Sequence, residues 1–259
     1  MSRIYPLFSS SKGNCTYIGS KSEGILIDCG VSYSRIKKAL ADCGIIIENA
    51  VRAVFITHEH SDHISGLKTL SKKLSVPVYA RRQTLDGLIG GGYIAEGREM
   101  DGEINLGSCT VRAFSTSHDV PSCGYRIDFS EGSSCAVCTD LGFVSEEVVS
   151  SLMGCRAVLI ESNYDNELLS SCGYPSYLKS RIRSRSGHLS NTDCGALCAQ
   201  LIPYGTEKFI LGHLSRDSNT PERALSVNEQ LLTEHGFLKN RDYIMTAALP
   251  DGQGEFTAF

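Results

Sequence analysis

The sequence has no long apolar run and no apolar segment near its start. A membrane-spanning helix needs roughly 18 or more consecutive apolar residues, and no such run occurs among the 259 residues. The stretch before Ser9 carries no apolar segment of the kind that directs export. We therefore expect a cytoplasmic protein without a membrane partner.

Linker-like, low-complexity and repeated segments are also missing, as is an excess of positive charge. A chain of 259 residues with 41% hydrophobic residues could bury roughly three quarters of the surface that its unfolded form exposes. We expect a single domain over residues 1–259. The formal net charge is −4, which excludes a globally basic nucleic-acid binder, so any attraction for a polyanion must be local.

Cysteine is abundant, but its pattern supports neither disulfides nor a zinc cluster. The number of cysteines, eleven, is odd, and a long chain without an export signal does not require disulfides. Cys135 and Cys138 lie three apart in an apolar run, so they face opposite sides of a strand. Cys194 and Cys198 fit one face of a helix, yet neither pair has the second pair that a four-ligand zinc site needs. We expect mostly buried, reduced thiols.

Short apolar or β-branched runs alternate with longer amphipathic stretches along the chain. The expected strands are Ile4–Phe8, Thr16–Gly19, Ile25–Asp28, Ala53–Ile56, Val78–Ala80, Cys109–Phe114, Gly124–Phe129, Cys135–Thr139, Ala157–Ile160, Lys208–Leu211 and Ile244–Ala247. The expected helices are Tyr33–Asp42, Ile64–Leu74, Gln83–Ile89, Glu146–Met153, Pro175–Ser184, Thr192–Leu201 and Pro221–His235. Strand runs come first and helices return late, which favours an α/β protein with an αββα sandwich of two mixed β-sheets over a doubly wound sheet.

The strongest chemical motif is Thr-His-Glu-His-Ser-Asp-His at positions 57–63, between an apolar strand and a helix. Imidazoles at alternate positions of an extended segment project to the same side, so His58 and His60 can hold one ion. Asp62 and His63 follow at the helix entry, where the turn directs them toward a second ion. Packing explains this motif poorly, because each buried polar side chain would need its own partner.

Four ligands from one loop cannot complete two metal shells, so further ligands are needed at later strand ends. Three residues occupy such positions: His118, Asp140 and His213. Taken singly, a histidine near a strand end is more often a core or surface residue, and an aspartate there is more often a turn former. Taken together, the three supply the missing ligands.

The order His-x-His-x-Asp-His, followed by His, Asp and His at strand ends, resembles the metallo-β-lactamase superfamily over nearly the whole chain. The resemblance implies the αββα fold and two divalent ions. It assigns the first ion to His58, His60 and His118, the second ion to Asp62, His63 and His213, and the bridging position to Asp140. It also implies that Asp28 braces the metal loop by accepting a hydrogen bond from a ligand.

Finer motifs occupy positions 9–15, 161–163, 186–191 and 213–219. Together they are similar to the YycJ/WalJ group of bacterial proteins, regarded as nucleases, and more distantly to PhnP-type cyclic phosphodiesterases. This similarity implies a 5′-to-3′ exonuclease that acts on DNA. The substrate contacts expected are Ser11, Asn14, His188 and Ser215 from these motifs and Arg185 from the basic run before them, and the catalytic residues expected are Asp62 and His188.

Paired divalent ions suit hydrolysis because they lower the pKa of a water toward about 7. Histidine and carboxylate ligands accept Zn, Mn or Fe, and the sequence does not choose between these metals. A phosphodiester is the expected substrate, since His188 remains after seven ligands are assigned and could protonate a leaving oxygen. A cationic run of Lys179, Arg181, Arg183 and Arg185 precedes it and could steer phosphate, although such a run is as often a solvated helix face.

The partner expected is a nucleic-acid end, most simply single-stranded DNA: the resemblance implies DNA, and the acidic balance with one short basic run suits an end better than a long duplex. Long structured RNA is disfavoured because the segment from Asp140 to His213 is too short for the inserted clamp domain of RNase J-like relatives. Glu161 and Asn163 are expected at the pocket rim. A glyoxalase II-like thioesterase with the same seven ligands remains an alternative. A lactamase is disfavoured because it usually lacks the bridging aspartate, and a non-enzymatic metal-binding regulatory module would need an eighth ligand to close the site.

Overall fold

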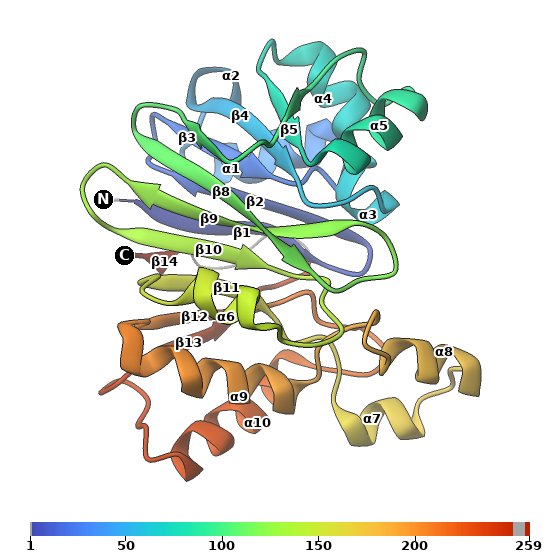
Figure 1. The fold of residues 1–259 in the computed structure, drawn as a ribbon, viewed down its shortest axis with the longest axis vertical. Coiled ribbons are helices and arrows are strands. Elements are labelled where there is room, and N and C mark those ends of the chain that lie inside the picture. Colours follow the sequence, from blue (N-terminus) through green and yellow to red (C-terminus); the bar gives the residue numbers. More distant parts are fainter. Residues whose placement is uncertain (1, 251–256) are drawn as a thin grey trace.

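Two β-sheets pack face to face and carry helices on both outer sides (Figure 1). The computed structural model describes residues 2–250 and 257–259. In Figure 1, α1, α2, α4 and α5 lie beside the first sheet, and α6, α9 and α10 lie beside the second. The expected αββα sandwich is confirmed.

The first sheet has the strand order β14-β1-β2-β3-β4-β5-β6. Its strands are β1 (Arg3–Ser10), β2 (Gly13–Gly19), β3 (Gly24–Ile27), β4 (Val51–Ile56), β5 (Val78–Ala80), β6 (Arg98–Glu99) and β14 (Thr257–Ala258). The pairs from β14 to β3 are antiparallel, and the pairs from β3 to β6 are parallel. The sheet is therefore mixed, as expected.

The second sheet has the order β13-β12-β11-β10-β9-β8-β7. Its strands are β7 (Glu103–Asn105), β8 (Cys109–Thr116), β9 (Ser122–Phe129), β10 (Ser134–Cys138), β11 (Ala157–Glu161), β12 (Lys208–Gly212) and β13 (Ile244–Ala247). The pairs from β7 to β10 are antiparallel, and the pairs from β10 to β13 are parallel. This sheet is mixed as well.

The helices connect and cover these strands. They are α1 (Tyr33–Asp42), α2 (Ile47–Ala50), α3 (Ser61–Ile64), α4 (Leu67–Lys73), α5 (Arg82–Gly90), α6 (Glu146–Leu152), α7 (Asn166–Ser171), α8 (Ser176–Ile182), α9 (Asn191–Leu201), the 3-10 turn η1 (Ile202–Tyr204) and α10 (Pro221–Glu234). No helix in residues 2–250 and 257–259 combines the length and apolarity that crossing a membrane requires.

Side-chain alternation along the strands explains the layers. In β3, Ile25 and Ile27 belong to the core between the sheets, whereas Leu26 belongs to the core under the helices of the first sheet. In β10, Cys135 faces the central core and Cys138 the core under α6, α9 and α10. Strands covered on both faces are apolar at every position, and the two cysteines three residues apart do face opposite sides.

The expected helix Ile64–Leu74 is wrong, because the structure divides it into α3 and α4. Gly66 interrupts it: its backbone N–H donates to Cys29 O at 2.8 Å, and a Cβ there would lie 1.9 Å from Val31 O. The chain must pack backbone against backbone at this point, so the helix breaks. The short elements β6, β7, β14, α2 and α7 were not expected from the sequence.

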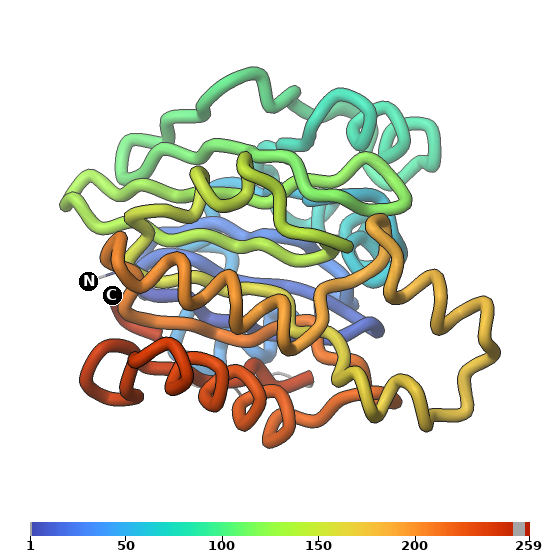
Figure 2. Tube along the Cα trace, turned by 60° about the horizontal axis from the view of Figure 1, so that its bottom comes forward, coloured from blue at the N-terminus to red at the C-terminus, as the bar shows by residue number. Residues whose placement is uncertain are grey.

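The parallel strands end at one edge of the sandwich. The strands β3 and β4 of the first sheet and β10, β11 and β12 of the second are each followed at that edge by a polar residue or motif. The helices α7 and α8 project from the body near this edge, as the two views in Figures 1 and 2 agree. The edge is therefore where side chains from both sheets can meet.

Candidate metal centre

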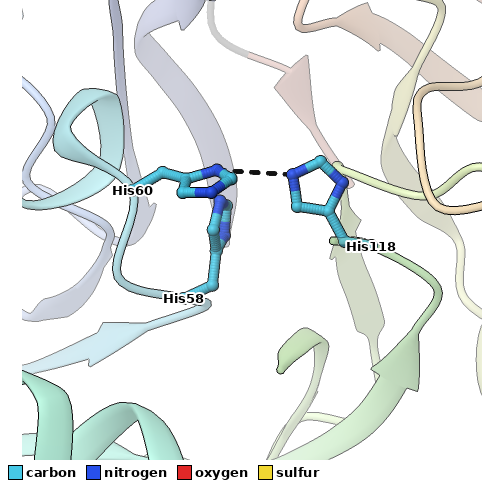
Figure 3. Close-up of side chains that lie close together, drawn as sticks. All are labelled: His58, His60 and His118. Carbon is cyan, nitrogen blue, oxygen red and sulfur yellow. Dashed lines mark hydrogen bonds between the residues drawn. The ribbon is translucent and has the colours of Figure 1, made fainter. Parts of the chain in front are cut away.

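Three histidines from the two sheets converge at this edge (Figure 3). His58 follows β4, His60 precedes α3, and His118 follows β8. One ring nitrogen of each lies within 4.8 Å of the others, and Nδ1 of His60 is 3.4 Å from Nε2 of His118. This triad could hold one metal ion.

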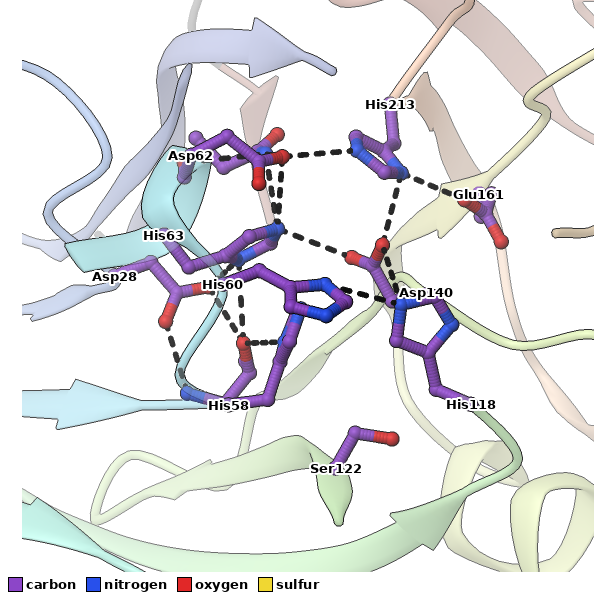
Figure 4. A network of polar contacts seen from close by, with 12 residues as sticks. Asp28, His58, His60, Asp62, His63, His118, Ser122, Asp140, Glu161 and His213 are labelled. Atoms are coloured by element: carbon purple, nitrogen blue, oxygen red, sulfur yellow. Dashed lines mark hydrogen bonds and ion pairs between the residues drawn. The ribbon is translucent and has the colours of Figure 1, made fainter. Parts of the chain in front are cut away.

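A second group lies beside it and is joined to it by a carboxylate (Figure 4). Ligand atoms of Asp62, His63 and His213 also lie within 4.8 Å of one another. Asp140 reaches both groups, because its oxygens are 3.3 Å from His63 Nε2, 3.4 Å from His213 Nδ1 and 3.8 Å from His118 Nε2. The structure thus brings together all seven side chains expected as ligands.

The chemistry of these side chains fits cations. The buried atoms His58 Nε2, His213 Nε2 and Asp140 Oδ2 have no hydrogen-bond partner in the described part of the chain. Buried polar atoms are normally satisfied, so their convergence points to a ligand for all three. Imidazole and carboxylate donors suit divalent transition metals.

Burial and neighbouring charges set the protonation states of these donors. Burial lowers the pKa of His58 well below its ordinary value, which keeps the imidazole in the neutral form that binds a metal ion. Burial would raise the pKa of Asp140, but His213 and His63 outweigh it and hold the pKa well below the usual range. Asp140 is therefore an ionised carboxylate between the two groups.

Hydrogen bonds hold the outer nitrogens of three histidines of this cluster. Asp28 accepts from Thr57 N–H at 2.8 Å and lies 2.7 Å from Nδ1 of His63. Thr57 Oγ1 lies 3.0 Å from Nδ1 of His58, and Gly187 O lies 3.1 Å from Nδ1 of His118. Such contacts fix ring orientation and raise ligand basicity. Asp28 thus contacts both the start of the 57–63 motif and His63.

Glu161 does not lie at the pocket rim, where the sequence analysis expected it. Its side chain is fully buried at the end of β11. Oε1 lies 2.6 Å from His213 Nδ1 and 2.9 Å from His188 Nδ1, and Oε2 accepts from Leu141 N–H and Leu189 N–H, both at 3.0 Å. Burial opposes ionisation, but His188 and His213 outweigh it and lower the pKa of Glu161 to about 2. One carboxylate therefore orients two histidines.

Asp119 is a second residue whose place the sequence did not indicate. Its Oδ1 lies 3.3 Å from Nε2 of both His60 and His118, and its other oxygen pairs with Arg181 of α8. The side chain of His60 is 32% exposed, so Asp119 restrains the ligand histidine that the fold encloses least. A carboxylate directly after a ligand histidine was the one available clue.

Asn14 and Ser215 contact the protein rather than the pocket opening. The Asn14 side chain is buried, and its Nδ2 lies 3.1 Å from Asp62 Oδ2 and 3.0 Å from His63 Nε2. Ser215 Oγ accepts from Ser218 N–H at 3.2 Å inside a turn. Ser11, in contrast, is exposed in the turn between β1 and β2.

The cationic run that precedes His188 does not form one patch. Lys179 Nζ and Arg183 Nη2 each reach Ser170 of α7 at 2.7 Å. Arg181 pairs with Asp119, and the Arg185 guanidinium lies 3.7 Å from the centre of the Phe143 ring. Residues two apart on a helix point about 200° apart, so alternate cations leave α8 on opposite sides. The run therefore offers fewer free charges than its sequence suggests.

Comparisons with known proteins agree with this geometry. A family model described as a beta-lactamase superfamily domain matches residues 24–214. The chain is 35% identical over 238 residues to exodeoxyribonuclease YycJ of Bacillus anthracis, covering 89% of each chain. It is 33% identical over 225 residues to exodeoxyribonuclease WalJ of Streptococcus pneumoniae, covering 84% of this chain and 83% of that protein. The metallo-beta-lactamase fold protein YhfI of Bacillus subtilis superposes with a TM-score of 0.72 at 14% identity, over 99% and 98% of the two chains.

Proposed function

The chain belongs to the metallo-β-lactamase superfamily and is a metal-dependent hydrolase, and from that premise we propose that it hydrolyses phosphodiester bonds with two divalent ions held by the seven ligands. Asp140 is the shared ligand in this proposal. Zn, Mn and Fe all suit the donor set. The family carries many reactions, so the choice of bond rests on residues outside the ligand set.

The observation that carries the proposal is the position of His188. Its ring centroid lies 5.3 Å from those of His118 and His213, although neither ligand triad requires it. Glu161 occupies Nδ1 of His188, which leaves Nε2 for a substrate, and 22% of the side chain is exposed. A histidine fixed in this way can donate a proton to a leaving oxygen.

Each residue then has a defined task in hydrolysis. Bound divalent ions supply an activated water and neutralise phosphate charge. His188 Nε2 would donate its proton to the leaving alkoxide, and Glu161 would keep the ring oriented while it does so. Asp62, whose side chain is 20% exposed, has Oδ2 directed at His63 and His213, so its other oxygen, Oδ1, would accept a hydrogen bond from the attacking water and orient it, and the proton that this water loses would pass to solvent.

Within the phosphodiesterases we place this chain among the DNA exonucleases, acting on single strands from a 5′ end. The relatives named exodeoxyribonucleases, which align over most of the chain, support DNA as the substrate. The 5′ polarity rests on the resemblance of the motifs at 9–15, 161–163, 186–191 and 213–219 to the YycJ/WalJ group alone. A net charge of −4 supports an end rather than a long duplex, which needs many basic contacts.

A panel of three substrates tests the reaction class. Bis-p-nitrophenyl phosphate, S-lactoylglutathione and nitrocefin would be offered side by side, with Mn and Zn each supplied. We expect turnover of the phosphodiester. Rapid hydrolysis of S-lactoylglutathione without phosphodiester turnover would identify a thioesterase and overturn the proposal.

A further inference from the structure

The helix α8 carries two faces with different partners. Lys179 and Arg183 are four residues apart, hence on one face, and both contact Ser170 of α7. That face joins the two helices of the projecting arm. Tyr177 and Arg181 are also four residues apart, and they share the other face. Their positions along the helix therefore place Lys179 and Arg183, which contact α7, on a different face from Tyr177 and Arg181.

The second face leads to the metal centre. Arg181 pairs with Asp119, whose Oδ1 lies 3.3 Å from Nε2 of His60. Arg181 also keeps 58% of its side chain exposed, so the rest of its guanidinium is open to a phosphate. Tyr177 lies about one helical turn, roughly 5.4 Å, along the axis from Arg181.

Folding does not explain Tyr177. Its side chain is 76% exposed, and α8 buries none of its residues. A large aromatic ring that stays exposed to water adds little to the free energy of unfolding. An exposed ring one helical turn from a cation that pairs with Asp119, beside His60, is, however, the pairing that binds single strands, with the ring under a base and the cation on the backbone.

We propose that Tyr177 and Arg181 form a docking surface for a single nucleic-acid strand that enters the metal centre. Tyr177 stacks on a base next to the scissile phosphate, and Arg181 holds the adjoining phosphate. The proposal rests on the proposed phosphodiesterase function and names how that site takes its substrate. Stacking tolerates every base, so the surface confers no sequence preference.

The test compares Tyr177→Ala and Tyr177→Phe with wild type and with Tyr204→Ala, using metal-loaded enzyme. Tyr204 is 56% exposed in η1, at the end of α9 away from the metal edge. Fluorescence anisotropy would measure binding of a labelled oligothymidylate with phosphorothioate linkages that slow its cutting, and of an abasic strand of equal length. We expect Tyr177→Ala to weaken binding of the oligothymidylate about tenfold, while Tyr177→Phe and Tyr204→Ala stay near wild type.

The abasic strand separates stacking from other effects. Wild type should bind it about as weakly as Tyr177→Ala binds the oligothymidylate, and Tyr177→Ala should lose nothing further. Equal losses on both strands, or no loss on either, would overturn the docking surface while wild-type cutting of the phosphodiester linkage kept the proposed function intact. A wild type that neither binds nor cuts strands would overturn both.

Discussion

Three residues of the metal edge adopt a backbone conformation that non-glycine residues rarely take. Asp28, Asp140 and His213 have φ values of 61°, 58° and 53°. Each follows a parallel strand within two positions. A left-handed conformation costs on the order of 1–3 kcal/mol at a non-glycine residue, and each of the three side chains contacts another residue of the candidate metal centre. The strain is therefore concentrated where the ligands and their brace lie.

Asp140 is the residue on which the two-ion proposal depends most. Its carboxylate reaches His63, His118 and His213, so Asp140→Ala removes a donor from both groups at once. We expect wild type to hold two ions per chain and the variant to lose at least one, by elemental analysis after saturation with Zn or Mn. The exposed Asp42 at the end of α1 provides the control, Asp42→Ala. One ion or fewer in saturated wild type, with unchanged activity in Asp140→Ala, would refute the dinuclear centre.

His188 separates catalysis from coordination. We expect His188→Ala to keep its fold and metal content but to lose phosphodiester turnover by roughly 10²–10⁴-fold, the usual contribution of a general acid. His235→Ala removes an exposed histidine at the end of α10 and should change neither property.

A second possible set of metal ligands, which includes His188, makes this test decisive. Ligand atoms of Asp140, Glu161, His188 and His213 also lie within 4.8 Å of one another and could hold an ion. Loss of metal from His188→Ala, with retention in His213→Ala, would make His188 the ligand instead.

The convergence of the seven side chains could be predicted because four belong to one motif after β4 and the other three each follow a strand of the second sheet, and strand ends can be read from hydrophobic runs. Glu161 ends a strand as well, yet its sequence does not reveal that it is buried against His188 and His213. Asp119 lies between His60, 59 positions earlier, and Arg181, which lies 62 positions later. Contacts between distant segments depend on the closed fold, so local patterns could not supply them.

At the scale of elements, the loop after β3 holds the metal loop in place through its backbone. Cys29 N–H donates to His63 O at 2.7 Å, and Gly30 N–H donates to Asn14 O at 2.7 Å. The loop therefore lies between β2 and α3. A Cβ at Gly30 would come within 1.6 Å of Asp62 O, so only glycine allows this approach.

Gly30→Ala should therefore displace α3 together with Asp62. Overpacking of this kind costs about 1–3 kcal/mol or more, so we expect a lower free energy of unfolding in urea and weaker metal retention. Gly90→Ala is the matched control, because a Cβ there meets nothing within 4 Å at the end of α5. A Gly30→Ala variant as stable and as metal-rich as Gly90→Ala would show that the close packing of this loop is unimportant.

Helices and strands were predictable where the hydrophobic periodicity is strong. The prediction failed where contacts between backbone segments determine where a helix ends. The range Tyr33–Asp42 agrees with α1, whose buried side chains Ile36, Ala39 and Leu40 follow helical spacing. The interruption at Gly66 arises from packing against the loop after β3, which lies more than thirty positions earlier. A single glycine in a helical pattern is tolerated too often to predict such a break.

At the scale of the whole molecule, the centre joins the two halves of the sandwich. The first sheet leads to the motif at 57–63, and the second leads to His118, Asp140 and His213. Each of the two groups of side chains that could hold an ion draws residues from both halves. The projecting arm of α7 and α8 belongs to the second half and reaches the centre through Arg181 and Asp119, so a substrate strand would contact both halves.

The final prediction follows from the scarcity of free cations around this centre. Lys179 and Arg183 are directed toward α7, Arg181 already pairs with Asp119, and the net charge is −4, so we expect few phosphates to be neutralised. Binding of single strands should weaken only modestly with salt, because the slope scales at about −0.7 per phosphate neutralised. A protein that contacts so few phosphates of the nucleic-acid backbone should need a strand end to position the scissile bond.

We expect Mn-dependent degradation of end-labelled linear single strands from the 5′ terminus, at a rate that depends on the 5′ phosphate, and no cutting of circular single strands. Circles cut as fast as linear strands would refute an end-directed enzyme, and mononucleotides released first from the 3′ end would reverse the polarity while leaving the exonuclease intact.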